Sequence, residues 1–193
     1  MAARDRCHHR AFAAYSERMH VDTARTADVD RIVGLVNDAY RGSSKTPGWT
    51  HETALITGYR TDAATVTAMI GQQDSNVLVV RHEGNVVACV ALQRLDDSNW
   101  YLSLLAVDPE HQTYGVGKGI MASAERYAGE RGARSMKISV INVREALLAW
   151  YERQGYVRTG AVEPFPYDDA TVGTPLRSDL ALVTLTKTLR PIG

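Results

Sequence analysis

The sequence predicts an α/β fold in which a mixed central sheet is flanked by helices. Apolar residues recur at helical spacing from Val29 to Tyr40, which indicates an amphipathic helix early in the chain. The pattern then changes to two β-rich runs on either side of Glu83, Gly84 and Asn85, a sequence typical of a hairpin turn. From residue 99 onward, strand-like and helix-like segments alternate. These observations predict the order β-α-α-β-β-β-α-β-α-β-β in one α/β domain.

Each element is predicted from its periodicity and from the residues that bound it. Thr26 or Asp28 can cap the first helix, Thr61 a later helix and Asn142 the last one, which Gly155 ends. The expected elements are a strand over His20–Arg25, a helix over Val29–Tyr40, a helical stretch over Glu52–Gly58, a helix in RTDAATVTAMI (60–70), the two hairpin strands, a strand at WYLSLLAV (100–107), a helix at GKGIMASAERYAGERG (117–132), a strand at RSMKISVI (134–141), a helix at VREALLAWYERQ (143–154), and strands at YVRTGAV (156–162) and DLALVTLTKTL (179–189).

The charge balance argues against two classes of partner. The 193 residues carry 22 basic and 22 acidic side chains, so the formal net charge is zero. Broad electrostatic binding to nucleic acid or to an anionic membrane needs an excess of basic residues. We therefore expect neither partner. Residues 19–190 are expected to form the domain, and residues 1–18 an N-terminal extension.

The cysteines and the paired histidines do not predict a metal site. Cys7 and Cys89 lack the CxxC spacing, and Cys89 lies within an apolar run, which is typical of a small core residue. His8 and His9 have no nearby partner ligands, so a solvated position is the simpler interpretation. No apolar stretch reaches membrane-spanning length. These features favour a soluble protein of the reducing cytoplasm.

Three glycines, Gly115, Gly117 and Gly119, alternate in VDPEHQTYGVGKGI (107–120) and indicate an anion-binding helix start. The spacing differs from the G-x-G-x-x-G of a dinucleotide-binding loop. A P-loop requires a hydroxyl residue after Lys118, where this chain has glycine. Metal-free binding of a pyrophosphate fits the pattern, and a glycine-rich helix start that binds nothing is the plainer alternative.

Two segments together resemble the GNAT N-acetyltransferase superfamily. LAVDPEHQTYGVGKGI (105–120) is similar to its acetyl-CoA signature, with Gln112, Gly115 and Gly117 in register. About 35 residues further on, INVREALLAWYERQGYVRTG (141–160) is similar to the second conserved block of the family. The resemblance extends roughly from Val21 to Leu189, nearly the whole chain.

The resemblance implies a fold in which the fourth and fifth strands splay apart and acetyl-CoA binds between them. Its pantetheine arm is expected to pair with the edge of the fourth strand, where one N–H group polarises the thioester carbonyl. Its pyrophosphate is expected on the N–H groups before and within the start of the following helix. The expected cofactor-binding residues are Leu105, Ala106, Val107, Gln112, Thr113, Tyr114, Gly115, Val116, Gly117, Lys118, Gly119, Asn142 and Tyr151.

The same resemblance implies direct attack of an acceptor amine on the thioester, with Tyr151 donating a proton to the departing sulfur. Tyr151 also lies four residues after Leu147, so its ring is equally suited to a place in the core. Asn142 is expected as a helix cap, alone or with a contact to the pantetheine arm. Glu52 is the first candidate for the base that deprotonates the amine, and His51 and Tyr40 are weaker candidates. A carboxylate in the first turn of a helix is the competing interpretation of Glu52.

The expected acceptor site is formed by loop residues. Trp49, Glu52, Tyr59 and Arg60 are assigned to it, although Trp49 is equally suited to anchoring a loop. Arg60 either binds a carboxylate of the substrate or forms a surface ion pair. Phe165 and Tyr167 are expected to close the far wall of the pocket.

These inferences predict an acetyl-CoA-dependent N-acetyltransferase that acts on a primary amine of a small molecule or peptide. A catalytically inactive module that binds or senses acyl-CoA is the alternative. No metal is expected, and a homodimer is expected by analogy with the family.

Overall fold

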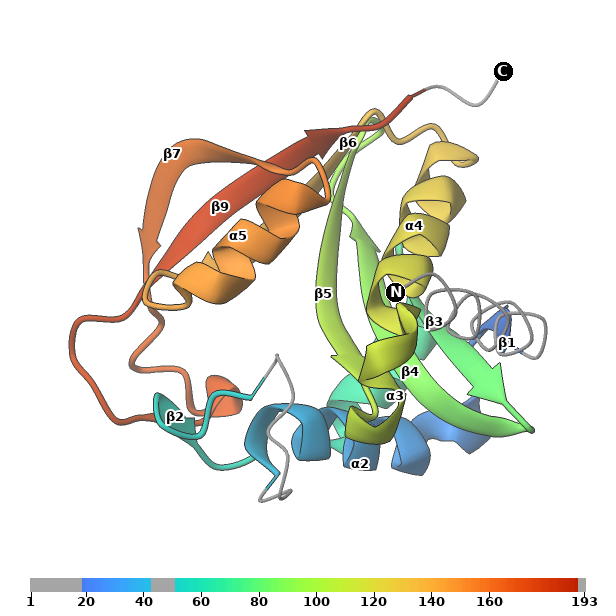
Figure 1. Cartoon of the computed structure of the whole chain (residues 1–193), viewed down its shortest axis with the longest axis horizontal. Coiled ribbons are helices and arrows are strands. Elements are labelled where there is room, and N and C mark those ends of the chain that lie inside the picture. Colours follow the sequence, from blue (N-terminus) through green and yellow to red (C-terminus); the bar gives the residue numbers. More distant parts are fainter. Residues whose placement is uncertain (1–18, 43–50, 191–193) are drawn as a thin grey trace, which may run out of the picture.

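The computed structural model describes residues 19–42 and 51–190 and confirms the mixed α/β fold. A mainly antiparallel sheet has the strand order β1-β3-β4-β5-β6-β9-β7, and a small second sheet pairs β2 with β8 (Figure 1). The elements are β1 (Met19–Thr23), η1 (Thr26–Asp28), α2 (Val29–Arg41), β2 (Ile56–Thr57), α3 (Ala63–Gly71), β3 (Ser75–His82), β4 (Asn85–Arg94), β5 (Asn99–Val107), η2 (Pro109–Tyr114), α4 (Val116–Gly129), β6 (Ser135–Ile141), α5 (Glu145–Arg153), β7 (Val157–Pro164), η3 (Ala170–Val172), β8 (Thr174–Pro175) and β9 (Ala181–Thr188).

Helices cover both faces of the sheet, so the central strands are buried on both sides. Alternate residues of β4 belong to two different apolar clusters, as the two-residue period of a strand requires. Val90 joins the cluster beneath α4 and α5, whereas Cys89 joins the cluster beneath α2 and α3. This double burial explains why β4 reads as a continuous apolar run, and it confirms Cys89 as a core residue.

The central feature of the sheet is the separation of β5 from β6. These two strands pair in parallel only over Asn99–Tyr101 and Ser135–Lys137. Beyond that point β6 continues along β9, while β5 continues along β4 through a bulge in which Leu104 has a φ of 48°. In Figure 1 the two strands lie together near the top of the view and diverge below it. The expected splay of the fourth and fifth strands of the main sheet is therefore confirmed.

The helix predicted over Glu52–Gly58 is wrong. The carbonyl of Glu52 accepts hydrogen bonds from the N–H groups of Leu55 and Ile56, which makes a single turn, and the chain then enters β2. Its partner β8 lies more than 100 residues away, and a β-carbon at Gly173 next to β8 would collide with the Thr57 carbonyl. A pairing at such a sequence separation leaves no local periodicity to detect.

Two caps also differ from the prediction. The cap of α3 is Asp62, whose carboxylate accepts from the N–H of Thr65 at 2.7 Å, and not Thr61. Asp28 occupies the N-cap position of α2, but its carboxylate does not bond to the first turn of that helix. It accepts instead from the N–H of Arg25 at 2.8 Å and from both terminal nitrogens of Arg81 on β3, at 3.0 and 2.7 Å. The hydrogen bond from Arg81 holds the pKa of Asp28 below its ordinary value of 3.8.

Replacing Asp28 by asparagine should lower the free energy of unfolding by about 1–2 kcal/mol at pH 7, because it removes a charged pair that joins η1 to β3. The pKa of the folded state is the lower one, so this stabilisation is present above pH ~4 and is lost as the pH falls through the folded-state pKa. Urea unfolding of both proteins between pH 7 and pH 2.5 measures the difference. The control is Asp30→Asn at an exposed position of the same helix. A deficit of equal size at every pH would contradict the assignment.

Candidate active site

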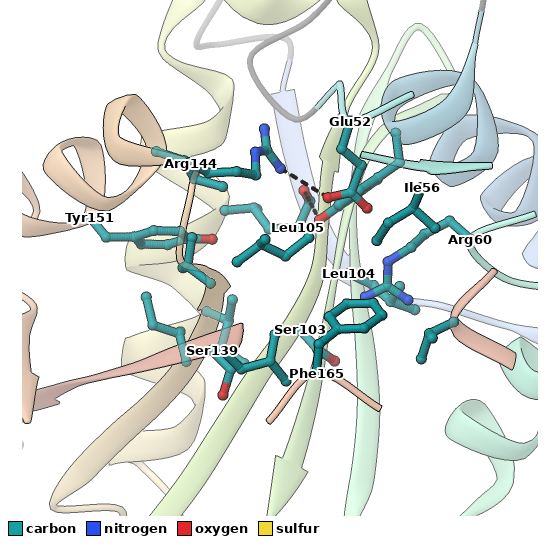
Figure 2. Close-up of a pocket in the computed structure, with 18 of the residues that line it drawn as sticks. Glu52, Ile56, Arg60, Ser103, Leu104, Leu105, Ser139, Arg144, Tyr151 and Phe165 are labelled. Carbon is teal, nitrogen blue, oxygen red and sulfur yellow. Dashed lines mark hydrogen bonds and ion pairs between the residues drawn. The ribbon is translucent and has the colours of Figure 1, made fainter. Parts of the chain in front are cut away.

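A cavity of about 240 Å³ lies where β5 and β6 separate (Figure 2). Its walls come from both strands, from α5, from the end of α2 and from the loops around β2 and η3. The two strands no longer pair here. The residues along their facing edges therefore line the cavity. The lining residues are Tyr40, Arg41, Glu52, Ile56, Arg60, Tyr101, Leu102, Ser103, Leu104, Leu105, Ile138, Ser139, Val140, Ile141, Arg144, Leu147, Tyr151, Phe165, Pro166, Val172 and Leu182.

Tyr151 on α5 belongs both to the core and to the cavity wall. Tyr151 is only 7% exposed. Its ring packs edge to face against the rings of Trp150 and Tyr156, with centroid distances of 5.0 Å to Trp150 and 5.6 Å to Tyr156. The hydroxyl points into the cavity in Figure 2. Burial raises the pKa of this phenol well above its ordinary value of 10.0, so it is protonated at neutral pH. The core and cavity interpretations of this side chain therefore hold together.

Of the two weaker candidates for a base, Tyr40 lines the cavity and His51 does not. The hydroxyl of Tyr40 donates to the carbonyl of Leu105 at 3.1 Å, and burial raises its pKa to about 12. It is a hydrogen-bond donor at neutral pH and not a proton acceptor. His51 lies 2.6 Å from the hydroxyl of Thr53 through its Nε2 and does not line the cavity.

Glu52 forms the centre of a buried ionic triad at the cavity wall. Its Oε1 accepts from Arg41 at the end of α2, and its Oε2 accepts from Arg144 just before α5, at 3.2 Å. The side chains of Arg41, Glu52 and Arg144 are only 7%, 5% and 9% exposed. Since no helix begins here, the interpretation of Glu52 as a first-turn helix carboxylate is wrong. Sequence reasoning missed both arginines, because an arginine in or beside an amphipathic helix is usually solvated.

The first turn of α4, the helix that follows the glycine-rich loop, has no side-chain cap. Gly115 is its N-cap, in the left-handed conformation with φ of 69°, and offers no side chain to cap the first turn. That turn contains no acidic residue, while Lys118 and Gly119 are exposed on it. The Nε2 of Gln112 donates to the carbonyl of Val107 at 3.0 Å and so fastens the loop to the end of β5. These features suit an anion at the helix start.

The remaining predicted residues of this region have mixed outcomes. Leu105 lines the cavity, whereas Ala106 and Val107 are buried in β5. Val116 and Gly117 are buried at the start of α4. The side chains of Thr113 and Tyr114 lie outside the described part of the structure.

Asn142 does not cap α5, whose N-cap is Arg144. Its amide nitrogen donates to the carbonyl of Asp179 at 3.0 Å, and its amide oxygen accepts from the N–H of Ala181, also at 3.0 Å. Asn142 thus joins the end of β6 to the start of β9. The side chain therefore stabilises the part of the sheet formed by β6 and β9, which diverges from β5.

The residues expected around the acceptor are only partly brought together. Arg60 and Phe165 line the cavity, but Tyr167 packs behind Phe165, with ring centroids 5.3 Å apart, and bonds to the main chain of Leu180. Tyr59 is 81% exposed and borders a neighbouring cavity. Trp49 lies outside the described residues.

Two further observations concern metals and membranes. Within residues 19–42 and 51–190, no three His, Cys, Asp or Glu side chains cluster in a way that could hold a metal ion. Over the same ranges, every helix is too short or too polar to cross a membrane.

Comparisons with known proteins agree with this geometry. Residues 29–156 match the sequence model of the Acetyltransferase (GNAT) family. The ribosomal-protein-S18-alanine N-acetyltransferase of Escherichia coli superposes with a TM-score of 0.66 at 17% identity, over 91% of this chain and 96% of that chain. Ard1 from Thermoplasma volcanium gives 0.67 at 17% identity, over 90% and 99%. Nourseothricin acetyltransferase gives 0.64 at 21% identity, also over 90% and 99%. At such identities the likeness establishes the fold. No curated protein matches the chain by sequence.

The ionic triad yields a test of stability. Replacing Glu52 by glutamine should lower the free energy of unfolding by roughly 3–5 kcal/mol, because two buried guanidinium groups lose their carboxylate. The matched control is Glu163→Gln, which breaks the exposed pair with Lys137 and should change stability by about 0.5 kcal/mol or less. Denaturant unfolding of the three proteins compares the two losses. Equal losses would show that the triad is not a tightly coupled unit.

Proposed function

The chain belongs to the GNAT acetyltransferase family, and we propose that it transfers an acetyl group from acetyl-CoA to the primary amine of a small molecule or peptide. The observation that carries this proposal is the cavity between the diverging strands, with the protonated hydroxyl of Tyr151 directed into it. Such a cavity provides a strand edge for an extended ligand and a proton donor beside the ligand.

The residues along β5 fit the amide-rich arm of acetyl-CoA. Two carbonyls at the end of this strand already have partners, since Leu105 accepts from Tyr40 and Val107 accepts from Gln112. Hydrogen-bond donors are therefore what this edge can offer to a ligand. We assign the main chain of Leu105, Ala106 and Val107 to the pantetheine arm, and one of their N–H groups to the acyl carbonyl.

The start of α4 fits the diphosphate. Its first-turn N–H groups have no side-chain cap, and the helix dipole places partial positive charge there. Gly117 and Gly119 carry no side chain that would keep a phosphate at a distance, and Lys118 adds a full positive charge. We assign the main chain from Gln112 to Gly119 to this role.

When bound, acetyl-CoA supplies a thioester whose acyl carbon accepts the nucleophile and whose sulfur departs. Tyr151 holds a proton on its hydroxyl and donates it to that sulfur. Glu52 is the one carboxylate that lines the cavity among the described residues, and we assign it to accept the proton of the acceptor's amine. Arg41 and Arg144 orient this carboxylate through their ion pairs.

Four further expectations stay predictions. They are the single domain over residues 19–190, the homodimer, the cytoplasmic location and the independence of the reaction from metal ions. The homodimer is checked by sedimentation, and metal independence by activity in the presence of a chelator.

The proton-donor role predicts that Tyr151→Phe lowers turnover by roughly 100-fold or more, while the affinity for CoA changes little. The control is Tyr156→Phe, because Tyr156 is a buried tyrosine next to Tyr151 that does not line the cavity. CoA release with an amine panel measures turnover, and calorimetry measures CoA binding. A turnover unchanged in Tyr151→Phe would remove the acid role and favour a module that binds acyl-CoA without acting on it.

The diphosphate site predicts that Gly119→Asp weakens CoA binding by roughly tenfold or more, since it places a negative charge in the first turn of α4. Gly119→Ala is the matched control, because a β-carbon there meets no atom within 4 Å. Calorimetry with CoA, with and without Mg²⁺, and with ATP measures the effect. Tight binding of Mg-ATP in place of CoA, or equal CoA affinity in both variants, would contradict this site.

A further inference from the structure

The cavity carries more positive than negative charge. Its lining contains Arg41, Arg60 and Arg144 against the single carboxylate of Glu52, in a chain whose formal net charge is zero. Glu52 offsets one of the two arginines that it pairs with, so a positive charge remains in the triad and another remains on Arg60. The lining of this cavity thus favours a negatively charged ligand.

Arg60 is held in place from both ends. Its main-chain N–H donates to the amide oxygen of Asn37 at 2.6 Å, and the same oxygen accepts from the N–H of Thr61 at 3.3 Å. Its guanidinium lies over the ring of Tyr40, 5.3 Å from the centroid, and Tyr40 is itself fixed by the carbonyl of Leu105. A side chain fixed in this way loses little entropy when it binds a ligand.

Among the described residues, no carboxylate forms an ion pair with Arg60, so the alternative of a surface ion pair is not realised there. The nearest acidic residue along the chain, Asp62, uses its carboxylate to cap α3. The positioned guanidinium therefore keeps its hydrogen-bond donors for a ligand. Its planar fork matches a carboxylate with two parallel hydrogen bonds.

Arg60 also stands between two cavities. A second cavity, of about 590 Å³, shares Arg60, Tyr101, Ser103, Leu104 and Val172 with the first. The exposed side chain of Tyr59 borders it, so this cavity opens to solvent. In Figure 2, Arg60 and Tyr151 approach the first cavity from opposite sides. A ligand that entered past Arg60 would meet the proposed acetyl donor from the side opposite to α5.

We propose that the acceptor is an amine that also carries a carboxylate, and that Arg60 binds this carboxylate. The inference rests on the proposed acetyl transfer and names its substrate class. One guanidinium and one carboxylate balance each other in charge, and the amine end of the acceptor then extends from Arg60 toward the part of the cavity lined by Glu52 and Tyr151. Arg60 thereby selects amino-acid-like acceptors over plain amines.

The test uses pairs of acceptors that differ in a single group. 3-Aminopropanoate and 4-aminobutanoate are compared with their carboxamides, and 2-aminoethyl phosphate is the competing anion. We expect kcat/KM from CoA release to favour the carboxylates by roughly 10- to 100-fold. Arg60→Gln should abolish this preference by lowering kcat/KM for the carboxylates to the level of their carboxamides, and Arg60→Lys should restore part of it. Arg94→Gln, at an exposed arginine paired with Asp97, is the control.

A second readout does not depend on turnover. Phenylglyoxal modifies accessible guanidinium groups, and mass spectrometry measures the modification of Arg60. The amino carboxylates should protect Arg60 and the carboxamides should not. Equal protection by both classes, no protection by the carboxylates, or stronger selection of the phosphate would overturn the proposal. Protection of Arg60 without any CoA release would instead refute the acetyl transfer and leave the carboxylate site standing.

Discussion

The structure depends on one interruption of hydrogen bonding, at the point where β5 and β6 stop pairing. On its other side each strand remains paired, β5 with β4 and β6 with β9. The interruption therefore removes only the main-chain hydrogen bonds between β5 and β6, and both strands stay in the sheet. Buried main-chain groups require partners, and side chains supply two of them: Tyr40 bonds to Leu105, and Gln112 bonds to Val107. These two side chains thus stabilise the unpaired edge of β5, and the cavity lies along that edge.

A second interaction spans this interruption. Arg41 belongs to the helix layer beneath β5, whereas Arg144 precedes the helix beneath β6, and Glu52 binds both. The triad therefore joins the two halves of the molecule at the wall of the cavity. Buried ion pairs contribute less to net stability than their attraction suggests, because desolvation of the charges is costly. We attribute to this triad a role in fixing how far the two halves stand apart.

The sequence alone predicts the order of the main elements, the hairpin turn at Glu83 and Gly84 and, through the family resemblance, the splay. These features depend on local periodicity or on a short motif. The β2–β8 pairing and the triad depend on residues far apart in the chain, since Glu52 and Arg144 are 92 positions apart. No local pattern distinguishes a buried arginine from a solvated one. A short loop motif is enough to indicate the residues proposed to bind acetyl-CoA. The residues proposed to bind the acceptor are brought together by tertiary contacts, which the sequence does not reveal.

Burial of Tyr151 bears on the proposed acetyl transfer. An alkyl amine becomes a nucleophile only when it loses its proton, with an ordinary pKa near 10, and an exposed tyrosine loses its own proton in the same range. A donor of ordinary pKa would therefore fail as the acceptor became reactive. In this cavity desolvation raises the pKa of Tyr151, and it outweighs the opposing effect of the positive charge on Arg144. The two titrations are thereby separated, so the hydroxyl still holds the proton that the proposed acid role requires over the pH range in which an acceptor amine would be free to attack.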